Sequence, residues 1–431
     1  MLTASCTVLR EFLYALVELV IAVPRHLWSL SKRASRLEHF EQLNKLEALA
    51  NIELGTPPRQ LKSIFIAVGD QSGQAHAIKI IKLLRQRHPQ LEIRGFGGSD
   101  MQAQKVTILL PLADLNIMGF IDVIARLPLF FKAIYLFVRE IKRSKPDLVL
   151  LIDYPGLNRH LLRIARRHDI QVVDYIVPQL WAWAPWRVRD FKQASALLSI
   201  LPFETAWYQS QGAQAHFVGH PIADALPAIR SNSASNVIAI LPGSRKREIR
   251  SNLPLMMAAA VKLKSSHPQL NFVLPHSRPQ LAELIDEIVK DYAIDIKVSF
   301  SEWHQQLANV RAAWVVSGTA SLEVAAMGIP AVIVYKINSS LGSWVAQNAL
   351  SVPYIGGINL IANACLFPEL VGNKIDADDL CRAITPLLDD DKYAKLQVQL
   401  GEIRQRYLQP GVSQRVVKII ENIEPTTSSQ R

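Results

Sequence analysis

Val237-Ile-Ala-Ile-Leu-Pro-Gly-Ser-Arg245 and Trp314-Val-Val-Ser-Gly-Thr-Ala-Ser-Leu-Glu323 are the two stretches that decide the fold. In each of them an apolar, β-rich run meets a tight turn of small residues, and a helical pattern follows. The same alternation of strand and helix patterns continues on both sides, which predicts parallel sheets. We therefore expect an α/β chain with two doubly wound domains.

The two turns predict a pocket for a nucleoside diphosphate. A helix N-terminus exposes unpaired N–H groups and partial positive charge, which suit a phosphate oxygen. Arg245 adds a charged fork for a diphosphate, and Glu323 can accept hydrogen bonds from a ribose. Two ordinary turns with a solvated Arg245 remain the alternative. The residues expected to bind the nucleotide are Ser244, Arg245, Ser317, Gly318, Thr319, Ala320, Ser321 and Glu323.

Composition limits the class of protein and its partners. With 431 residues, 49% hydrophobic and 20% charged, the chain has enough material for two domains with full cores. The net charge of +11 indicates anionic partners. We expect a phosphorylated substrate or an acidic membrane surface rather than nucleic acid, because no nucleic-acid-binding signature is present. The three cysteines form no paired framework, which suits a reducing cytoplasm, and no metal-binding spacing is found.

Residues 1–62 form an N-terminal extension. Its apolar run Phe12–Val23 contains Glu18 and is too short to span a bilayer. The basic residues Arg25, Lys32, Arg33 and Arg36 follow it, as in a helix that lies on an anionic membrane surface. An extra helix packed on the body of the protein is the equal alternative.

In residues 63–226, the first expected domain, Asp153 is the main candidate for catalysis. The strand pattern Asp147–Ile152 ends immediately before Asp153, and ligands of open α/β sheets bind beyond the carboxyl ends of the strands. The alternative is a helix cap. The stretch Met118–Val138 is apolar with interspersed basic residues, so it predicts either a membrane-facing surface or two helices that cover a sheet.

A polar segment, Pro227–Ser235, predicts the hinge to a second domain at residues 227–410. Residues 411–431 predict a C-terminal helix, which we expect to pack back on the first domain, and a disordered tail.

Taken together, the motifs resemble those of the lipid-A-disaccharide synthase family, and the resemblance runs from about Ser63 to Ile423. It rests on motifs spread along the chain: Leu241-Pro-Gly-Ser-Arg245 with Glu248, Ser317–Glu323, Trp181-Ala-Trp183 with Arg187, Leu201-Pro-Phe-Glu204, Phe217-Val-Gly-His-Pro221, Met118-Gly119 and Asn359-Leu360. The first loop departs from the family pattern, with Asp70 in place of a glutamate, Gln74 in place of an aspartate and Ala77 in place of a glycine.

The resemblance implies a GT-B fold, with two Rossmann-like domains facing across a cleft, and an inverting hexosyltransferase. The reaction it implies joins UDP-2,3-diacylglucosamine to 2,3-diacylglucosamine 1-phosphate and releases UDP. It implies Asp153 as the general base with Asp70 as second choice, Asn359 near the diphosphate or sugar, and no cofactor. The acceptor side would then comprise Ser72, Gly73, Met118 and Trp183.

The resemblance further implies a cytoplasmic enzyme, peripheral on the inner face of the bacterial inner membrane, and a possible homodimer. Two other functions remain open. One is a GT-B transferase that uses a UDP-amino sugar with another lipid acceptor, and the other is a non-catalytic nucleotide- or lipid-binding paralogue. A nucleic-acid binder has only the net charge in its favour.

Overall fold

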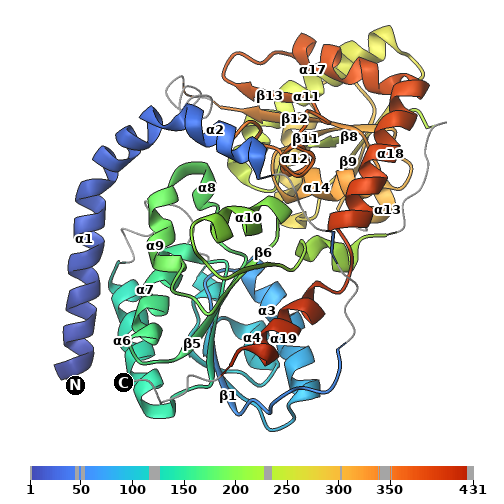
Figure 1. Cartoon of the computed structure of the whole chain (residues 1–431). Coiled ribbons are helices and arrows are strands. Elements are labelled where there is room, and N and C mark those ends of the chain that lie inside the picture. The colour runs from blue at the N-terminus through green and yellow to red at the C-terminus, as the bar shows by residue number, and fades with distance from the viewer. Residues whose placement is uncertain are drawn as a thin grey trace. The chain divides into compact units, whose positions relative to one another are not determined.

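The computed structural model describes residues 2–43, 48–49, 54–115, 127–227, 235–300, 303–337, 339, 350 and 352–424. The chain forms two compact units (Figure 1). Unit 1 comprises residues 1–32, 45–221 and 410–431, and unit 2 comprises residues 33–44 and 222–409.

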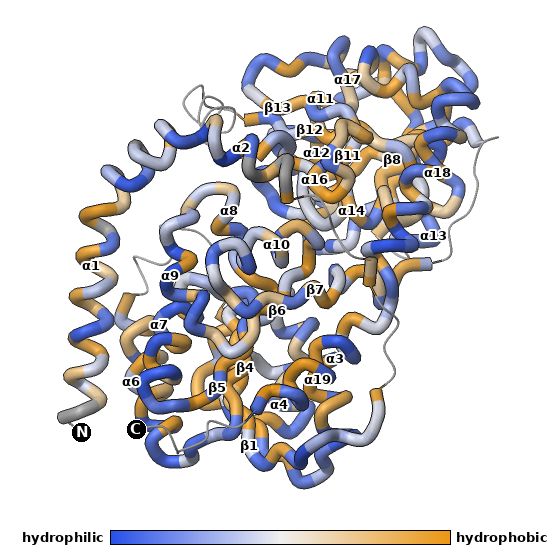
Figure 2. Tube along the Cα trace, in the orientation of Figure 1, coloured by the Kyte–Doolittle hydropathy of each residue, from blue (hydrophilic) through white to orange (hydrophobic). Residues whose placement is uncertain are grey.

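Unit 1 is built on a parallel sheet of seven strands in the order β3-β2-β1-β4-β5-β6-β7. The strands are β1 (Ser63–Val68), β2 (Glu92–Phe96), β3 (Thr107–Leu110), β4 (Leu148–Ile152), β5 (Gln171–Tyr175), β6 (Ala196–Ser199) and β7 (Ala215–Phe217). The central strand β4 is apolar throughout (orange in Figure 2) and is buried over its whole length, as expected where helices cover both faces of a sheet.

The order of these strands reverses between β1 and β4, which are neighbours in register, with Val68 opposite Ile152. In doubly wound sheets, this switch point is where a crevice opens beyond the carboxyl ends of the strands. The residues that follow β1 and β4 therefore lie at the place where such a sheet binds its ligand.

Helices cover both faces of the unit 1 sheet, with α3, α4 and α19 on one side and α6, α7 and α9 on the other (Figure 1). The helices after the extension are α3 (Gln71–Arg87), α4 (Ser99–Ala103), α6 (Leu127–Ser144), α7 (Pro155–Arg166), α8 (Leu180–Trp183), α9 (Val188–Phe191), α10 (Pro202–Ser210) and α19 (Val412–Asn422). Short 3-10 turns complete the unit at Ala113–Leu115 and Pro185–Arg187, and a third, Pro221–Ala225, lies at the boundary.

Unit 2 repeats this design with six parallel strands in the order β10-β9-β8-β11-β12-β13. The strands are β8 (Val237–Leu241), β9 (Asn271–Pro275), β10 (Ile296–Ser299), β11 (Ala312–Val316), β12 (Ala331–Lys336) and β13 (Glu369–Gly372). Its switch point lies between β8 and β11, where the two deciding turns of the sequence begin.

The helices of unit 2 follow the same alternation. They are α11 (Lys246–Ser266), α12 (Ala282–Val289), α13 (Trp303–Leu307), α14 (Thr319–Ala326), α16 (Gly357–Ala362), α17 (Ala377–Ile384) and α18 (Asp390–Tyr407), with 3-10 turns at Pro279–Leu281 and Thr385–Leu388. The predicted pair of doubly wound sheets is confirmed. The sequence patterns missed the short strands β3 and β13.

The N-terminal extension contains α1 (Leu2–Ser31), which groups with unit 1, and α2 (Arg33–Gln42), which groups with unit 2. Helix α1 continues through Pro24 rather than ending there. No helix among the described residues is both long and apolar enough to cross a membrane. Three earlier predictions fall outside the described residues: most of the hinge, the start of the apolar stretch at residues 118–126, and the C-terminal tail.

Candidate functional site

In unit 1, the turn after β1 brings Asp70 to the start of α3. Asp70 caps the helix, because its Oδ1 accepts a hydrogen bond from the N–H of Gly73 at 2.7 Å. Gly69 leaves room for the ring of Tyr154, since a Cβ at residue 69 would lie 2.1 Å from Tyr154 Cγ. Ser72 is exposed in the first turn of α3, whereas Gly73 is buried.

Asp153 lies directly after β4, on the other side of the same switch point. Its backbone is left-handed, with φ of +45°, which is uncommon for a residue other than glycine and turns the chain sharply into α7. Burial raises the pKa of Asp153 from its ordinary value to about 7, and the negative charge of Asp70 adds to the shift. The carboxylate therefore changes its protonation state close to neutral pH, as a general base requires.

Asp174 is a third acid near this switch point, and sequence reasoning missed it. It lies in β5, is 1% exposed, and has its Oδ1 3.4 Å from the side-chain amide of Asn158. Its Oδ2 has no hydrogen-bond partner among the described residues. Burial raises the pKa of Asp174 well above its ordinary value, and the charge of Asp153 adds to this. The signal that could have identified Asp174 from the sequence is an acid within an otherwise apolar strand pattern.

The other acceptor-side candidates are placed as follows. Trp181 is buried and donates its Nε1–H to Glu204 Oε1 at 3.1 Å, so it belongs to the core. Trp183 is 40% exposed, and the guanidinium of Arg187 lies 5.0 Å from its ring centroid. Only Trp183 of this pair is available to a ligand. Met118 lies outside the described residues.

In unit 2, the two deciding turns open onto one pocket of about 460 Å³ at the β8–β11 switch point. Its lining, as far as the structure describes it, is Leu241, Pro242, Gly243, Ser244, Arg245, Glu248, Pro275, His276, Ser277, Trp303, His304, Val316, Ser317, Gly318, Thr319, Ala320 and Glu323. The structure thus brings together seven of the eight nucleotide-binding residues predicted from the two turns.

At the first turn, Glu248 occupies the position expected for an anion. Its Oε2 accepts hydrogen bonds from the N–H of Ser244 at 2.9 Å and of Arg245 at 3.2 Å. The Arg245 side chain is 66% exposed and donates from Nη1 to Glu248 Oε1 at 3.1 Å. Gly243 has φ of +102°, and a Cβ there would lie 2.6 Å from Glu248 Oε2. The turn therefore holds a carboxylate on its N–H groups, and Arg245 is within reach of the pocket.

The second turn presents Gly318, with φ of +149°, to open space at the start of α14. Thr319 and Ala320 follow in the first turn of this helix, where N–H groups have no intrahelical partner. Ser317 lines the pocket and donates its Oγ–H to the carbonyl of Ile355 at 3.2 Å. Ser321 is fully buried and donates to the carbonyl of Gly318 at 2.7 Å, so it shapes the turn and does not line the pocket.

Two side chains fix Glu323 at the wall of the pocket. Trp303 Nε1–H donates to Glu323 Oε2 at 2.9 Å, and His304 Nε2 lies 3.9 Å from the same oxygen. Burial raises the pKa of Glu323, and His304 and the Trp303 hydrogen bond oppose the rise. One carboxylate oxygen of Glu323 is therefore held by protein groups. Sequence reasoning had not identified Trp303 or His304, which belong to a separate helix.

His276, also missed from the sequence, lines the pocket as a neutral imidazole. Its Nδ1 accepts from the N–H of Arg278 at 3.1 Å, so the proton is on Nε2, which donates to the carbonyl of Gly243 at 3.0 Å. Burial lowers the pKa of His276. The imidazole thus supports the first turn and adds no positive charge.

Asn359 requires a correction. It is fully buried, its Nδ2 donates to Phe367 O and Glu369 Oε1, and its Oδ1 accepts from the N–H groups of Leu366 and Phe367. All its polar atoms are used to hold the segment between α16 and β13. Asn359 therefore supports the fold of unit 2 and does not line the pocket. Among the described residues, no group of acids, histidines or cysteines is arranged to hold a metal ion.

Comparison with known proteins adds to this geometry. A family model described as lipid-A-disaccharide synthetase matches residues 64–423. The lipid-A-disaccharide synthase of Geobacter sulfurreducens is 31% identical over 369 residues, which cover 83% of this chain and 96% of that protein. The corresponding synthase of Acidobacterium capsulatum is 34% identical over 385 residues, covering 83% and 95%.

Among solved structures, MurG of Acinetobacter baumannii matches with a TM-score of 0.56 and 16% identity, covering 83% of this chain and 99% of that one. At this identity the match shows a shared GT-B type of fold. The N-terminal helices α1 and α2 lie outside the residues that the family model matches.

Proposed function

This chain belongs to the lipid-A-disaccharide synthase family, and from that membership we propose how its two switch points divide the work of the reaction. The enzyme is a glycosyltransferase of lipid A biosynthesis, which condenses UDP-2,3-diacylglucosamine with 2,3-diacylglucosamine 1-phosphate. The reaction needs a base for the attacking hydroxyl and a site that stabilises the negative charge growing on UDP.

The base is Asp153, and the observation that carries this assignment is its pKa of about 7 at the β1–β4 switch point. A base with a pKa near the working pH is deprotonated often enough to act and is still basic enough to take a proton. Asp70 contributes by its charge, which helps to keep the pKa of Asp153 high, while its own Oδ1 is engaged in the α3 cap.

UDP binds in the unit 2 pocket. The N–H groups of Ser244 and Arg245 already hold a carboxylate oxygen of Glu248, which supports their capacity to bind an anionic oxygen. A diphosphate oxygen would compete with Glu248 for these donors, while Arg245 and the first turn of α14 supply further positive potential. Glu323 takes the ribose hydroxyls with the carboxylate oxygen that Trp303 leaves free.

On the acceptor side, Ser72, Gly73 and Trp183 contact the acylated glucosamine phosphate. Trp183 supports this proposal because it is exposed while its neighbour Trp181 is buried. Met118 is assigned to the same side from the family resemblance alone.

The location proposed for the enzyme is the cytoplasmic face of the inner membrane, as a peripheral protein. Both substrates carry acyl chains, and the net charge of +11 favours an anionic bilayer surface. A homodimer is proposed from the family resemblance, and sedimentation velocity in detergent tests it.

The test of the function is a transfer assay with radiolabelled UDP-2,3-diacylglucosamine and detergent-dispersed 2,3-diacylglucosamine 1-phosphate. We expect the tetraacylated disaccharide 1-phosphate and UDP. A different glycolipid product would show another acceptor, and UDP binding without any product would show a non-catalytic protein.

A further inference from the structure

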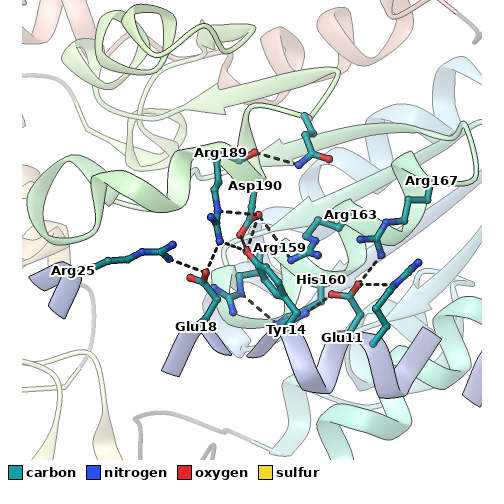
Figure 3. A network of polar contacts seen from close by, with 12 residues as sticks. Glu11, Tyr14, Glu18, Arg25, Arg159, His160, Arg163, Arg167, Arg189 and Asp190 are labelled. Atoms are coloured by element: carbon teal, nitrogen blue, oxygen red, sulfur yellow. Dashed lines mark hydrogen bonds and ion pairs between the residues drawn. The ribbon is translucent and has the colours of Figure 1, made fainter. Parts of the chain in front are cut away.

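Helix α1 has its polar side turned inward. Glu11, Tyr14 and Glu18 are three to seven residues apart, so they lie on one face of the helix. Glu11 is 1% exposed and Glu18 is 4% exposed, and both are surrounded by side chains of unit 1 (Figure 3). A helix packed by the hydrophobic effect would show the opposite arrangement.

Glu11 joins α1 to His160 of α7 and to Arg167, the residue directly after α7. His160 Nδ1–H donates to Glu11 Oε2 at 2.9 Å, while His160 Nε2 accepts from Arg159 Nε at 3.3 Å, so the imidazole is neutral. Arg167 Nη1 donates to Glu11 Oε1 at 2.8 Å. Burial alone would raise the pKa of Glu11, but the hydrogen bond from His160, the nearby charge of Arg163 and the hydrogen bond from Arg167 lower it overall. The Glu11 carboxylate is therefore charged and paired.

Tyr14 and Glu18 continue the same contact along the helix. The hydroxyl of Tyr14 donates to Asp190 of α9 at 2.7 Å, and the Arg163 guanidinium lies 3.3 Å from the Tyr14 ring centroid. Glu18 accepts hydrogen bonds from Arg189 and, at 2.8 Å, from Arg25. The orientation of α1 about its own axis is thus fixed by directional bonds.

The opposite face of α1 is apolar and exposed. Of the eleven large hydrophobic side chains that are exposed in the described part of the chain, seven lie on this helix. They are Leu9 (57% exposed), Phe12 (36%), Leu13 (51%), Leu16 (47%), Val17 (55%), Val20 (69%) and Trp28 (58%). The first six follow helical spacing and therefore form one stripe along the helix. We call these seven residues the α1 apolar face.

The charge around this face is positive. Glu11 and Glu18 are the only acids of α1, and both are buried on its other side. Arg10 has an exposed side chain, and Lys32 lies over the ring of Trp28 at 4.4 Å. Helix α6 packs beside α1, and its exposed charged side chains are all basic, namely Lys132, Arg139, Lys142 and Arg143. An apolar stripe with cationic flanks and an exposed tryptophan fits the boundary of an anionic lipid bilayer.

We propose that the α1 apolar face is the surface by which this protein binds an anionic lipid bilayer, with α1 lying parallel to the membrane plane. The proposal rests on the peripheral membrane location proposed above. It assigns the contact with the membrane to residues of α1, which lie outside the residues that the family model matches. The buried ion pairs keep the apolar face turned away from unit 1, so the helix is presented to lipid in a fixed orientation.

The sharpest test compares Val20→Asn with Val398→Asn. Both valines are exposed, at 69% and 62%, but Val398 lies on α18 in unit 2. The full-length protein is sedimented with vesicles of phosphatidylglycerol and phosphatidylcholine. We expect Val20→Asn to weaken vesicle binding about three- to tenfold, and the triple variant Leu13→Asn/Val17→Asn/Val20→Asn by more than tenfold, whereas Val398→Asn binds like the wild type.

Transfer activity on detergent-dispersed substrates serves as the independent readout, and all variants should retain it because the exchanged residues are exposed. Unchanged vesicle binding by the triple variant overturns the proposal while leaving the proposed function intact. A wild type that binds vesicles but makes no disaccharide overturns the function and not this surface. If the triple variant loses self-association while still binding vesicles, a second copy of the chain covers the face, and the proposal is wrong.

Discussion

The two switch points have the same topology and opposite chemistry. In unit 1, the chain around the ends of β1, β4 and β5 carries three acids, Asp70, Asp153 and Asp174. In unit 2, the turns after β8 and β11 present backbone N–H groups and Arg245, with Glu248 and Glu323 beside them, and His276 is neutral. The sheet determines where a ligand binds, and the first residues after each strand determine which charge it meets.

This contrast has a physical consequence in each unit. Burial raises the pKa of Asp153 and of Asp174, and the charge of a neighbouring acid adds to each shift, which yields a carboxylate at Asp153 that is able to take a proton near pH 7. Helix N-termini and a guanidinium attract an anion and stabilise charge on a leaving group. Four predictions test this division, from the largest expected effect to the smallest.

Asp153→Asn should lower the turnover number about a hundred- to ten-thousandfold, because the amide cannot accept the proton. In the wild type, activity should rise with pH up to about 7 and then level off, since the base must be deprotonated. The transfer assay between pH 5 and 9 measures both effects. Asp70→Asn is the matched control: asparagine still caps α3, and loss of the Asp70 charge should move the rise in activity to lower pH. If the Asp153→Asn variant keeps the turnover number of the wild type, the general base is another residue.

The same Asp153→Asn substitution should stabilise unit 1 at alkaline pH. The folded-state pKa of Asp153 is raised, so the folded protein holds its proton more tightly than the unfolded chain. The free energy of unfolding therefore falls as pH rises from about 4 to about 7. At pH values above 7, the Asp153→Asn substitution should therefore raise the free energy of unfolding, by an amount on the order of 4 kcal/mol at most.

Thermal melting at pH 5 and pH 8 measures this change, and the gain should be clearly larger at pH 8 than at pH 5. Asp286→Asn, which replaces an exposed acid of α12, is the control that should shift neither melt. A destabilised Asp153→Asn variant at pH 8 would show that the carboxylate is held by favourable contacts and would remove the argument for a raised pKa.

Arg245→Ala should lower turnover about ten- to a hundredfold, which corresponds to the loss of one charge-assisted hydrogen bond. The melting temperature should not change, because an exposed ion pair with Glu248 contributes little stability. Arg247→Ala, in the same turn of α11 and not among the residues lining the pocket, is the control. Equal losses in the two variants would mean that general positive potential, and not a specific contact, assists UDP departure.

The smallest effect is expected for Glu323→Gln, which should raise the dissociation constant of UDP about fivefold through one weakened hydrogen bond. Calorimetric titration with UDP and with 2′-deoxyuridine diphosphate separates the contacts. If Glu323 holds the ribose 2′-hydroxyl, the substitution should hardly alter binding of the deoxy ligand. An equal loss for both ligands would place the effect in the Trp303–Glu323 contact instead.

Much of the fold could be predicted from the sequence, because parallel strands covered on both faces read as unbroken apolar runs between turns. Strand β4, for example, lies within the predicted pattern Asp147–Ile152 and ends at the predicted residue. Strands β3 and β13 have four residues each and are only partly buried, so no pattern distinguishes them from loops.

The pocket of unit 2 could be predicted only in part. The two turns are local signals, but His276, Trp303 and His304 reach the pocket from other elements, and local patterns carry no information on such contacts. The role of Glu248 did have a local signal, a glutamate three residues after the helix cap. The role of Asn359 was transferred from the resemblance, and the structure replaces it with a buried hydrogen-bond network.

The sequence left open whether the extension packs on the protein or faces a membrane. The structure shows the packing directly, through Glu11, Tyr14 and Glu18. The signal was present, since an apolar run interrupted by acids on one helical face has two different sides. A hydropathy value averaged along the run combines both faces of the helix, so it does not reveal that one face is polar and the other apolar.

The contacts that hold α1 on unit 1 can form only late in protein synthesis. Tyr14 must find Asp190, which is 176 residues further along the chain, and Glu18 must find Arg189. At about 5–20 residues per second, the ribosome delivers these partners roughly ten to thirty-five seconds after α1 has emerged. Throughout that time α1 lacks its contacts with α9, so its orientation is not yet fixed and its apolar residues can meet a nearby bilayer. The nascent chain would then reach the membrane before the enzyme is complete.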